Sequence, residues 1–399
     1  MKKSKFLIIL IIVALLSSVI TFTFSTMLGI KYNDKILLPI EKYENLKHIE
    51  TKYEKAERLE TFISENFYKD ISRDIIEDGV LYGLFDSLDD PYSVYMNKKE
   101  FDDFNEQSNG TYGGIGIIVT ASKGDFITIV SPIEDTPGER AGLKSGDEII
   151  EANGIQVFSK EIDKAIDIMK GEPQTEVKLK IRRDTETFDV VITRELIVLK
   201  SVKSRIVNDK YGFIRITMFD SKVSDEFEEN LTQLLEENIE GLIIDLRNNP
   251  GGSLREVIEI ADRLLGEQMI VYTENRMNYK EEYKSDKDKL DLPLVVLVNQ
   301  GSASASEILT AAIQDTNSGT IIGTTTFGKG IVQSVIPLND GSGIKLTTSQ
   351  YFTPNGECIH GIGIEPDVTI EMLDSYYEIE KPTDEDDIQL QKAIEILEK

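Results

Sequence analysis

The sequence predicts an α/β core, with a mixed sheet flanked by helices, that carries an inserted smaller α+β unit and a helical N-terminal region. The core is predicted by the apolar runs at 241–246 and 292–298, which are unbroken, as in strands buried on both faces of a sheet. The inserted unit is predicted at 109–195, where short strands are separated by glycines. Residues 31–108 are rich in Lys, Glu, Leu and Tyr, and this composition favours helices.

The N-terminus predicts a membrane anchor. Lys2, Lys3 and Lys5 precede residues 6–30, which include no charged residue. As a helix this run would reach about 37 Å, enough to cross the hydrocarbon core of a bilayer. Because basic residues stay on the cytoplasmic side, residues 1–5 are expected in the cytoplasm and the rest outside, as a single-pass protein of the cell membrane. A cleaved signal peptide is the alternative, but its apolar region is usually shorter and ends in a small-residue site, which is not evident here.

Composition limits the classes of partner. The chain has 399 residues, enough for about two to three domains, and its formal net charge is −27. A strongly acidic surface repels nucleic acid and anionic lipid head groups, so neither is expected as a main partner. The single cysteine, Cys358, cannot form an internal disulfide, so the fold must depend on core packing.

The helical region is expected to have an apolar face. Pro39 suits the start of a helix, and Tyr43, Leu46, Ile49 and Tyr53 recur at spacings of three or four residues. This face would pack against the body of the protein or against a second copy of the chain, so a homodimer is a further expectation.

The remaining elements follow in order. In the inserted unit we expect strands at 113–119, 126–130, 176–182 and 187–193 and a helix at 159–170. In the core, at 196–372, we expect strands at 211–219 and 269–273 and helices at 224–238 and from a glycine turn to 265. Residues 373–399 are expected to form an acidic C-terminal tail with a last helix at 386–398.

The strongest chemical signal pairs serine with lysine. Ser302, Ser304 and Ser306 follow an apolar strand and precede a strongly helical segment, so they lie near unpaired backbone N–H groups that can hold an oxyanion. These serines could instead simply cap the helix. Lys329 lies between two glycines, with apolar neighbours and no adjacent carboxylate. Burial lowers the pKa of a lysine, so Lys329 could act as the general base, although alone it could be a turn residue.

Other chemistries fit less well. The only histidines are His48, on the N-terminal helix, and His360, in a late loop, so a Ser-His-Asp triad is not expected. The glycine-rich turn at 245–254 follows a buried strand, and its N–H groups could donate to an oxyanion or a phosphate. It lacks the lysine and the spacing of a P-loop, so a nucleotide site is discounted.

Three blocks, 245–254, 299–308 and 326–333, together resemble the signature blocks of the C-terminal processing peptidases, also called tail-specific proteases. Gly356 with 359–367 is similar to the closing block of that family. The resemblance covers about 60–370 in order. It implies a serine endopeptidase with a Ser–Lys dyad, a core like those of crotonase and Clp protease, and no cofactor or metal.

The resemblance assigns roles by position. Ser304 matches the nucleophile, Lys329 the base, and Gln333 the glutamine that orients the base. The N–H of Ala305 and that of Gly251 or Gly252 would form the oxyanion hole. The residues alone do not choose Ser304 over the serines on either side of it.

The inserted unit resembles a bacterial PDZ domain. Gly113, Gly114, Ile115 and Gly116 are similar to the loop that binds a chain terminus, which implies recognition of protein substrates with apolar C-terminal tails. The same glycines could form a simple bulge or turn. The function predicted is that of a membrane-anchored extracytoplasmic serine endopeptidase. The rivals are a scaffold that captures tails without chemistry, and an esterase or amidase acting on small molecules.

Overall fold

The computed structural model describes residues 2–28, 30–32, 35–121, 125–133, 135–373, 375–376, 379 and 382–399. The chain divides into two compact units, Met1–Leu84 and Phe85–Lys399.

The first unit is mostly helical. Helix α1 (Lys2–Leu28) covers most of the predicted anchor, and α2 (Ile40–Asn66) begins directly after Pro39, as expected. Strands β1 (Ile30–Tyr32) and β2 (Lys35–Leu37) form an antiparallel hairpin between them, which was not predicted. No residue of α2 is buried, so its apolar side chains face outward.

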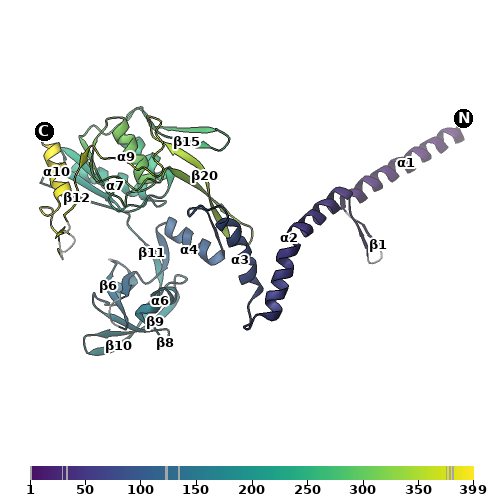
Figure 1. Cartoon of the computed structure of the whole chain (residues 1–399), viewed down its shortest axis with the longest axis horizontal. Coiled ribbons are helices and arrows are strands. Elements are labelled where there is room, and N and C mark those ends of the chain that lie inside the picture. Colours follow the sequence, from purple (N-terminus) through teal and green to yellow (C-terminus); the bar gives the residue numbers. More distant parts are fainter. Residues whose placement is uncertain are drawn as a thin grey trace. The chain divides into compact units, whose positions relative to one another are not determined.

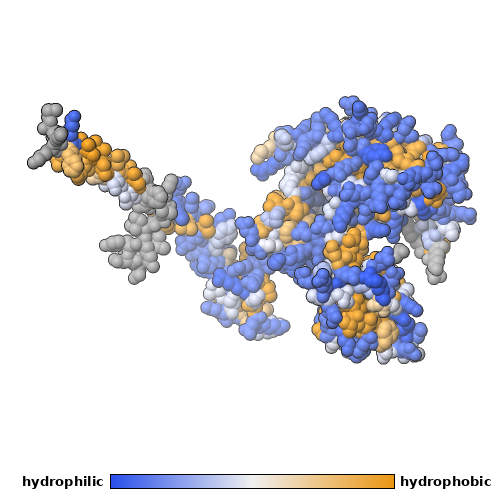
Figure 2. Space-filling view, turned by 180° about the vertical axis from the view of Figure 1, so that it is seen from behind, coloured by the Kyte–Doolittle hydropathy of each residue, from blue (hydrophilic) through white to orange (hydrophobic). Residues whose placement is uncertain are grey.

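The described side chains of α1, from Lys5 to Thr21, are all exposed, and Figure 2 shows a largely hydrophobic surface over this segment. Among the residues that the structure describes, no helix meets both the length and the apolarity needed to span a bilayer. The transmembrane part of the predicted fold is therefore not confirmed.

The inserted unit is a six-stranded sheet with its own core. Figure 1 shows its strands gathered around α6 (Ile162–Met169). The antiparallel strand order is β10-β9-β7-β6-β5, and β8 pairs with β7. The strands are β5 (Ile117–Ala121), β6 (Ile127–Pro132), β7 (Glu148–Ala152), β8 (Ile155–Gln156), β9 (Glu176–Arg183) and β10 (Glu186–Thr193). Ile127, Ile149 and Leu179 are fully buried between this sheet and α6.

Two strands mark where the chain enters and leaves this unit. Strand β4 (Thr111–Gly114) pairs antiparallel with β11 (Glu195–Val198) in a sheet of its own. The run 113–119 was predicted as one strand, but Ile115 and Gly116 break it into β4 and β5, which belong to different sheets. Gly116 has φ +71°, a conformation that a glycine adopts without strain.

The α/β core contains a six-stranded sheet with order β12-β13-β14-β17-β18-β21, in which only β12 and β13 pair antiparallel. These strands are β12 (Val202–Val207), β13 (Tyr211–Ile216), β14 (Gly241–Asp245), β17 (Leu294–Val298), β18 (Thr320–Gly323) and β21 (Val368–Thr369). Every residue of β14 and β17 is buried, so the predicted central strands and the α/β core are confirmed.

Helices cover both faces of this sheet. Side chains alternate between faces along a strand, so Leu242 and Ile244 pack with α7 (Val223–Glu236), α8 (Leu254–Leu264) and α9 (Ala305–Asp315). Ile243 faces the opposite side and packs with Leu390 of α10 (Ile388–Leu397). The last helix of the acidic segment is therefore part of the core.

A second, antiparallel sheet adjoins the core, with order β16-β15-β20-β19 and β3 paired with β20. Its strands are β3 (Val94–Met96), β15 (Met269–Asn275), β16 (Lys280–Lys284), β19 (Ile331–Pro337) and β20 (Gly343–Phe352). The remaining helices of the described chain are α3 (Arg73–Asp86), α4 (Lys98–Ser108) and the short α5 (Pro137–Arg140). Strand β19 is an edge strand that begins two residues after Lys329.

Candidate active site

The residues predicted for catalysis and for the oxyanion hole line one cavity of the core, with a volume of about 620 Å³. Three segments supply them: the loop after β14, the loop before α9 with the first residue of that helix, and the loop before β19 with the start of that strand. They are Gly251, Gly252, Ser304, Ala305, Lys329 and Gln333. The fold therefore brings together three segments that are far apart in the sequence.

Of the three serines before and in the first turn of α9, only Ser304 lines the cavity. Ser302 and Ser306 are fully buried, and their hydroxyls donate to the carbonyl oxygens of Leu246 (2.8 Å) and Asn249 (3.0 Å). Ser304 is half-buried, and its hydroxyl donates no hydrogen bond to a described residue, while its side chain forms a capping box with Glu307 at the start of α9. Its φ of 56° is unusual for a residue with a side chain, and such strain costs on the order of 1–3 kcal/mol and is found most often at functional sites.

Two backbone N–H groups at the cavity are free to donate. Ala305 is the first residue of α9, so its N–H has no acceptor within the helix. The N–H of Gly252 also has no acceptor among the described residues, while that of Gly251 donates to Asn249 Oδ1 at 2.9 Å. Of the two glycines that the sequence left open, the geometry favours Gly252 as the donor.

Gly251 matters for a different reason. A Cβ atom on this residue would lie 2.8 Å from the Cβ of Ser304 and 2.9 Å from the backbone nitrogen of Ala305. Its φ is +97°, which side chains rarely allow. Glycine is therefore required here for the loop after β14 to approach the start of α9.

Lys329 is half-buried, and its Nζ lies 4.6 Å from the centroid of the Tyr92 ring. Burial lowers the pKa of Lys329, and the positive charge of Lys345 lowers it further. The negative charges of Asp90 and Glu307 act in the opposite direction. The structure records no hydrogen bond between the side chains of Lys329 and Ser304, which line the same cavity.

Gln333 also lines the cavity, on β19, but it does not contact Lys329 through a hydrogen bond. Its side-chain amide donates to Thr347 Oγ1 at 3.4 Å, across the β19–β20 pair. The role expected for it, orienting Lys329, stays a prediction.

The sequence analysis missed several residues around the cavity. Glu307 is fully buried and accepts a hydrogen bond from the N–H of Ser304 at 2.8 Å. Glu307 lies three residues after a serine, which is the spacing of a capping box, and this spacing could have identified it in the sequence. The hydroxyl of the buried Tyr351 donates to the Ser304 carbonyl at 3.2 Å. Tyr92, Lys345 and Tyr351 lie outside the motifs, and no local pattern marks them.

The loop predicted to bind a chain terminus lies beside a separate groove, which is largely apolar and has a volume of about 310 Å³. Residues of β5 and α6 line this groove. Ile115 and Gly116 line the groove, and their N–H groups have no acceptor among the described residues. Gly113 and Gly114 belong to β4 and do not line it. A Cβ on Gly113 would lie 2.2 Å from the carbonyl oxygen of Gly171, so close packing requires this glycine.

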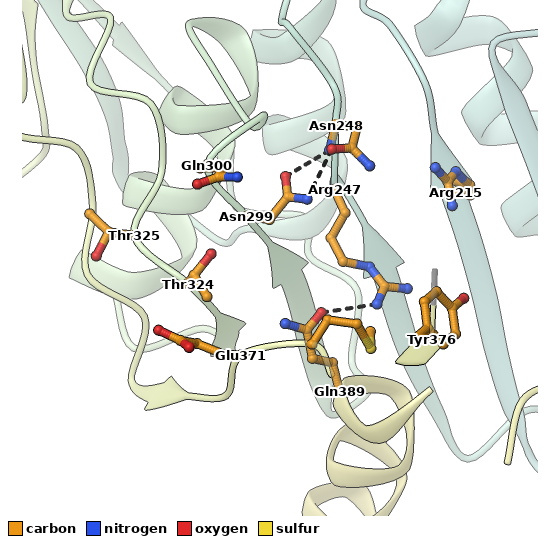
Figure 3. Close-up of a pocket in the computed structure, with 11 residues that line it drawn as sticks. Arg215, Arg247, Asn248, Asn299, Gln300, Thr324, Thr325, Glu371, Tyr376 and Gln389 are labelled. Atoms are coloured by element: carbon orange, nitrogen blue, oxygen red, sulfur yellow. Dashed lines mark hydrogen bonds between the residues drawn. The ribbon is translucent and has the colours of Figure 1, made fainter. Parts of the chain in front are cut away.

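The first residues of the three catalytic loops line a second, polar pocket of about 520 Å³ (Figure 3). Figure 3 shows Asn248 and Asn299 next to each other, joined by dashed lines. The Asn248 N–H donates to Asn299 Oδ1 at 2.9 Å, and Asn299 Nδ2 donates to Asn248 Oδ1 at 3.0 Å. These bonds fix the loop after β14 against the loop before α9.

Arg247 ties the same loop to α10. It donates to Asp245, to Asp387 and, as Figure 3 shows, to Gln389. Burial opposes the charge of Arg247, but hydrogen bonds and charges from Asp245 and Asp387 raise its pKa above the usual range. The loop that carries Gly251 and Gly252 is thus held in place from the far face of the sheet.

Three family models match successive parts of the chain. Residues 210–370 match the model of peptidase family S41, residues 128–183 that of a PDZ domain, and residues 17–100 that of the activating protease CtpB N-terminal domain.

Individual relatives agree. The carboxy-terminal processing protease CtpA of Bacillus subtilis is 36% identical over 328 residues, which cover 82% of this chain and 70% of the relative. A CtpA-like serine protease of Staphylococcus aureus is 35% identical over 375 residues, covering 93% of this chain and 73% of the relative. A solved S41 protease of Bacteroides fragilis has the same fold, with a TM-score of 0.53 and 16% identity over 78% of this chain and 87% of that one.

Proposed function

This chain belongs to peptidase family S41, as a CtpA-like C-terminal processing protease with a PDZ domain, and from that premise we propose that it cleaves peptide bonds with a dyad of Ser304 and Lys329. The single observation that carries the proposal is the shared cavity. Within it, the hydroxyl of Ser304, the half-buried Lys329 and two free N–H groups converge.

The proposed reaction uses each group in turn. The neutral amine of Lys329 removes the proton of the Ser304 hydroxyl as its oxygen attacks the substrate carbonyl carbon. The N–H groups of Ala305 and Gly252 hold the resulting oxyanion. The lysine ammonium then gives its proton to the leaving amine, and water hydrolyses the acyl-enzyme. In the structure Lys329 Nζ lies over the Tyr92 ring and has no hydrogen bond to Ser304, so the amine and the hydroxyl must come within hydrogen-bond distance before the first step.

Incubation of the protein with an unfolded protein substrate tests this activity. Fragments that form with the unaltered chain and not with the Ser304→Ala variant are expected. Binding of the substrate protein without cleavage would indicate a binding scaffold without catalytic activity. Turnover of activated esters without proteolysis would indicate an esterase.

A Gln333→Ala variant is expected to lose about tenfold in kcat, close to the net value of one hydrogen bond. The reason is that Gln333 would orient Lys329 without reacting itself. Steady-state kinetics measures this, with Thr347→Val as the control because it removes the present partner of Gln333 and leaves the amide free. A Gln333→Ala variant indistinguishable from the unaltered chain would remove the proposed role.

We propose that substrates enter by their C-terminal tails at the groove between β5 and α6. The free N–H groups of Ile115 and Gly116 suit a terminal carboxylate, and the apolar lining suits an apolar last residue. The protein partners would therefore carry apolar C-terminal tails.

An Ile166→Glu variant places a charge in this groove and is expected to weaken binding of a peptide with an apolar C-terminus at least tenfold, or about 1.4 kcal/mol. Fluorescence anisotropy measures the binding. Lys164→Glu, on the exposed face of the same helix, is the matched control. Equal affinities for Ile166→Glu and the control, or undiminished binding of an amidated peptide, would refute the assignment.

The location is also a proposal. The basic residues before the uncharged run 6–30 support a membrane anchor with the catalytic part on the extracytoplasmic side. Membrane fractionation checks it, and recovery of the intact chain in the soluble fraction would rule it out.

A homodimer is proposed from the surface of α2. Tyr43, Leu46 and Ile49 are each about half exposed on one stripe of this helix, at 55%, 48% and 53%. A second copy of the chain is the proposed cover for this stripe. Sedimentation analysis tests this, and a monomer at all accessible concentrations would exclude it.

A further inference from the structure

One buried carboxylate connects the two loops that carry the proposed dyad. Glu307 lies in the first turn of α9 and is fully buried. Its Oε1 accepts from the hydroxyl of Thr326 (2.6 Å) and the N–H of Gly328 (2.7 Å). Its Oε2 accepts from the N–H groups of Ser304 and Lys329, both at 2.8 Å. Each end of the dyad is therefore bonded, through its own backbone, to the same side-chain oxygen.

This arrangement needs a carboxylate. An ionised carboxylate only accepts hydrogen bonds, and here its two oxygens meet four donors. A glutamine in the same place would direct an NH₂ group at two of those donors. The backbone of Ser304 or that of Lys329 would then have to move.

The charge of Glu307 also reaches Lys329. It favours the protonated lysine, as Asp90 does, and it opposes the effects of burial and of Lys345. Tyr92, whose ring lies beside the ammonium, favours the protonated form as well. Glu307 and Asp90 are therefore two anions that partly offset the lowering of the Lys329 pKa by burial and by Lys345.

We propose that Glu307 is a positioning residue of the active site, which holds Ser304 and Lys329 at a fixed separation by bonding to the backbone of both. It does not contact the substrate. The proposal deepens the proposed dyad and depends on it.

The test is a Glu307→Gln variant of the full chain, assayed for kcat and KM against pH. The expected result is a loss of about 100-fold in kcat with little change in KM, since a small displacement of reacting groups has an effect of this size. The rising limb of the pH profile should also move to lower pH, because loss of the negative charge makes protonated Lys329 less stable. A role confined to stability would not move that limb.

Glu256→Gln is the matched control. Glu256 is also buried, also lies three residues after a serine that begins a helix, and accepts from Ser224. Its carboxylate bonds to Ser224 and not to the backbone of Ser304 or Lys329, so kcat and the pH limb should stay unchanged. An unchanged kcat for Glu307→Gln, or an equal loss in both variants without a shift of the limb, would overturn the proposal.

Two further variants keep the test decisive. If Glu307→Gln does not fold by circular dichroism, Thr326→Val removes one donor to Glu307, and an unaltered kcat there would also overturn the proposal. The Ser304→Ala variant separates this inference from the function itself. If Ser304→Ala retains turnover, the dyad fails, whereas an inactive Ser304→Ala beside a fully active Glu307→Gln defeats the positioning role alone.

Discussion

Replacement of Ser304 by alanine is expected to abolish proteolysis and leave the fold intact. The hydroxyl that it removes donates to no described residue and takes part only in the capping box with Glu307, so the folded state loses little. The unusual backbone conformation of Ser304 is present in both proteins, and a methyl group fits where a hydroxymethyl group did. Loss of a serine nucleophile lowers kcat by a factor on the order of 10⁴–10⁶.

Two neighbouring serines provide the controls. Ser302→Ala and Ser306→Ala each remove a buried hydrogen bond to a loop carbonyl, which costs about 1–3 kcal/mol of stability. Each should lower the melting temperature and keep most of the activity of the folded protein. A Ser304→Ala variant that still cleaves, beside an inactive Ser302→Ala or Ser306→Ala, would move the nucleophile to another residue.

The contrast among these serines shows where sequence reasoning stops. All three have the same local setting, a strand followed by a helix, and local chemistry treats them alike. They differ only because Leu246 and Asn249, more than fifty residues earlier in the chain, offer carbonyl oxygens to Ser302 and Ser306. Tertiary packing makes that choice, and only the family resemblance selected Ser304 in advance.

The predictable parts of the fold are those with strong local periodicity. The buried strands β14 and β17 and helices α7 and α8 follow from unbroken apolar runs and from amphipathic spacing. The break at Ile115 and Gly116 was not predictable in this way, because β4 leaves the run to pair with β11, about eighty residues later.

The surroundings of Lys329 also depend on residues that are distant from it in the sequence. Its glycine-flanked position predicted a candidate base, but not the ring beneath it. Tyr92 comes from a turn more than two hundred residues earlier, and Lys345 comes from the neighbouring strand β20. The properties that decide whether Lys329 can act as a base thus arise from contacts that no local pattern contains.

Replacement of Lys329 by alanine is expected to abolish turnover at every pH, by a factor on the order of 10⁴ or more, because it removes the amine proposed to take the serine proton. Lys329→Arg should be equally inactive, since a guanidinium stays protonated. Circular dichroism should show that both variants fold, because Lys329 makes no side-chain hydrogen bond or ion pair to a described residue.

The pH profile of the unaltered protein carries the stronger test, because only the neutral amine of Lys329 accepts a proton. The profile of kcat/KM should therefore rise as Lys329 deprotonates, with a midpoint below the 10.5 of an unburied lysine, since burial and then Lys345 lower its pKa. Lys345→Met removes a positive charge, which makes protonated Lys329 more stable and should move the rising limb to higher pH. Asp90→Asn should move it the other way, because Asp90 raises the pKa of Lys329. A limb that neither substitution moves would show that a different group is titrating, and Lys329 would then not be the base.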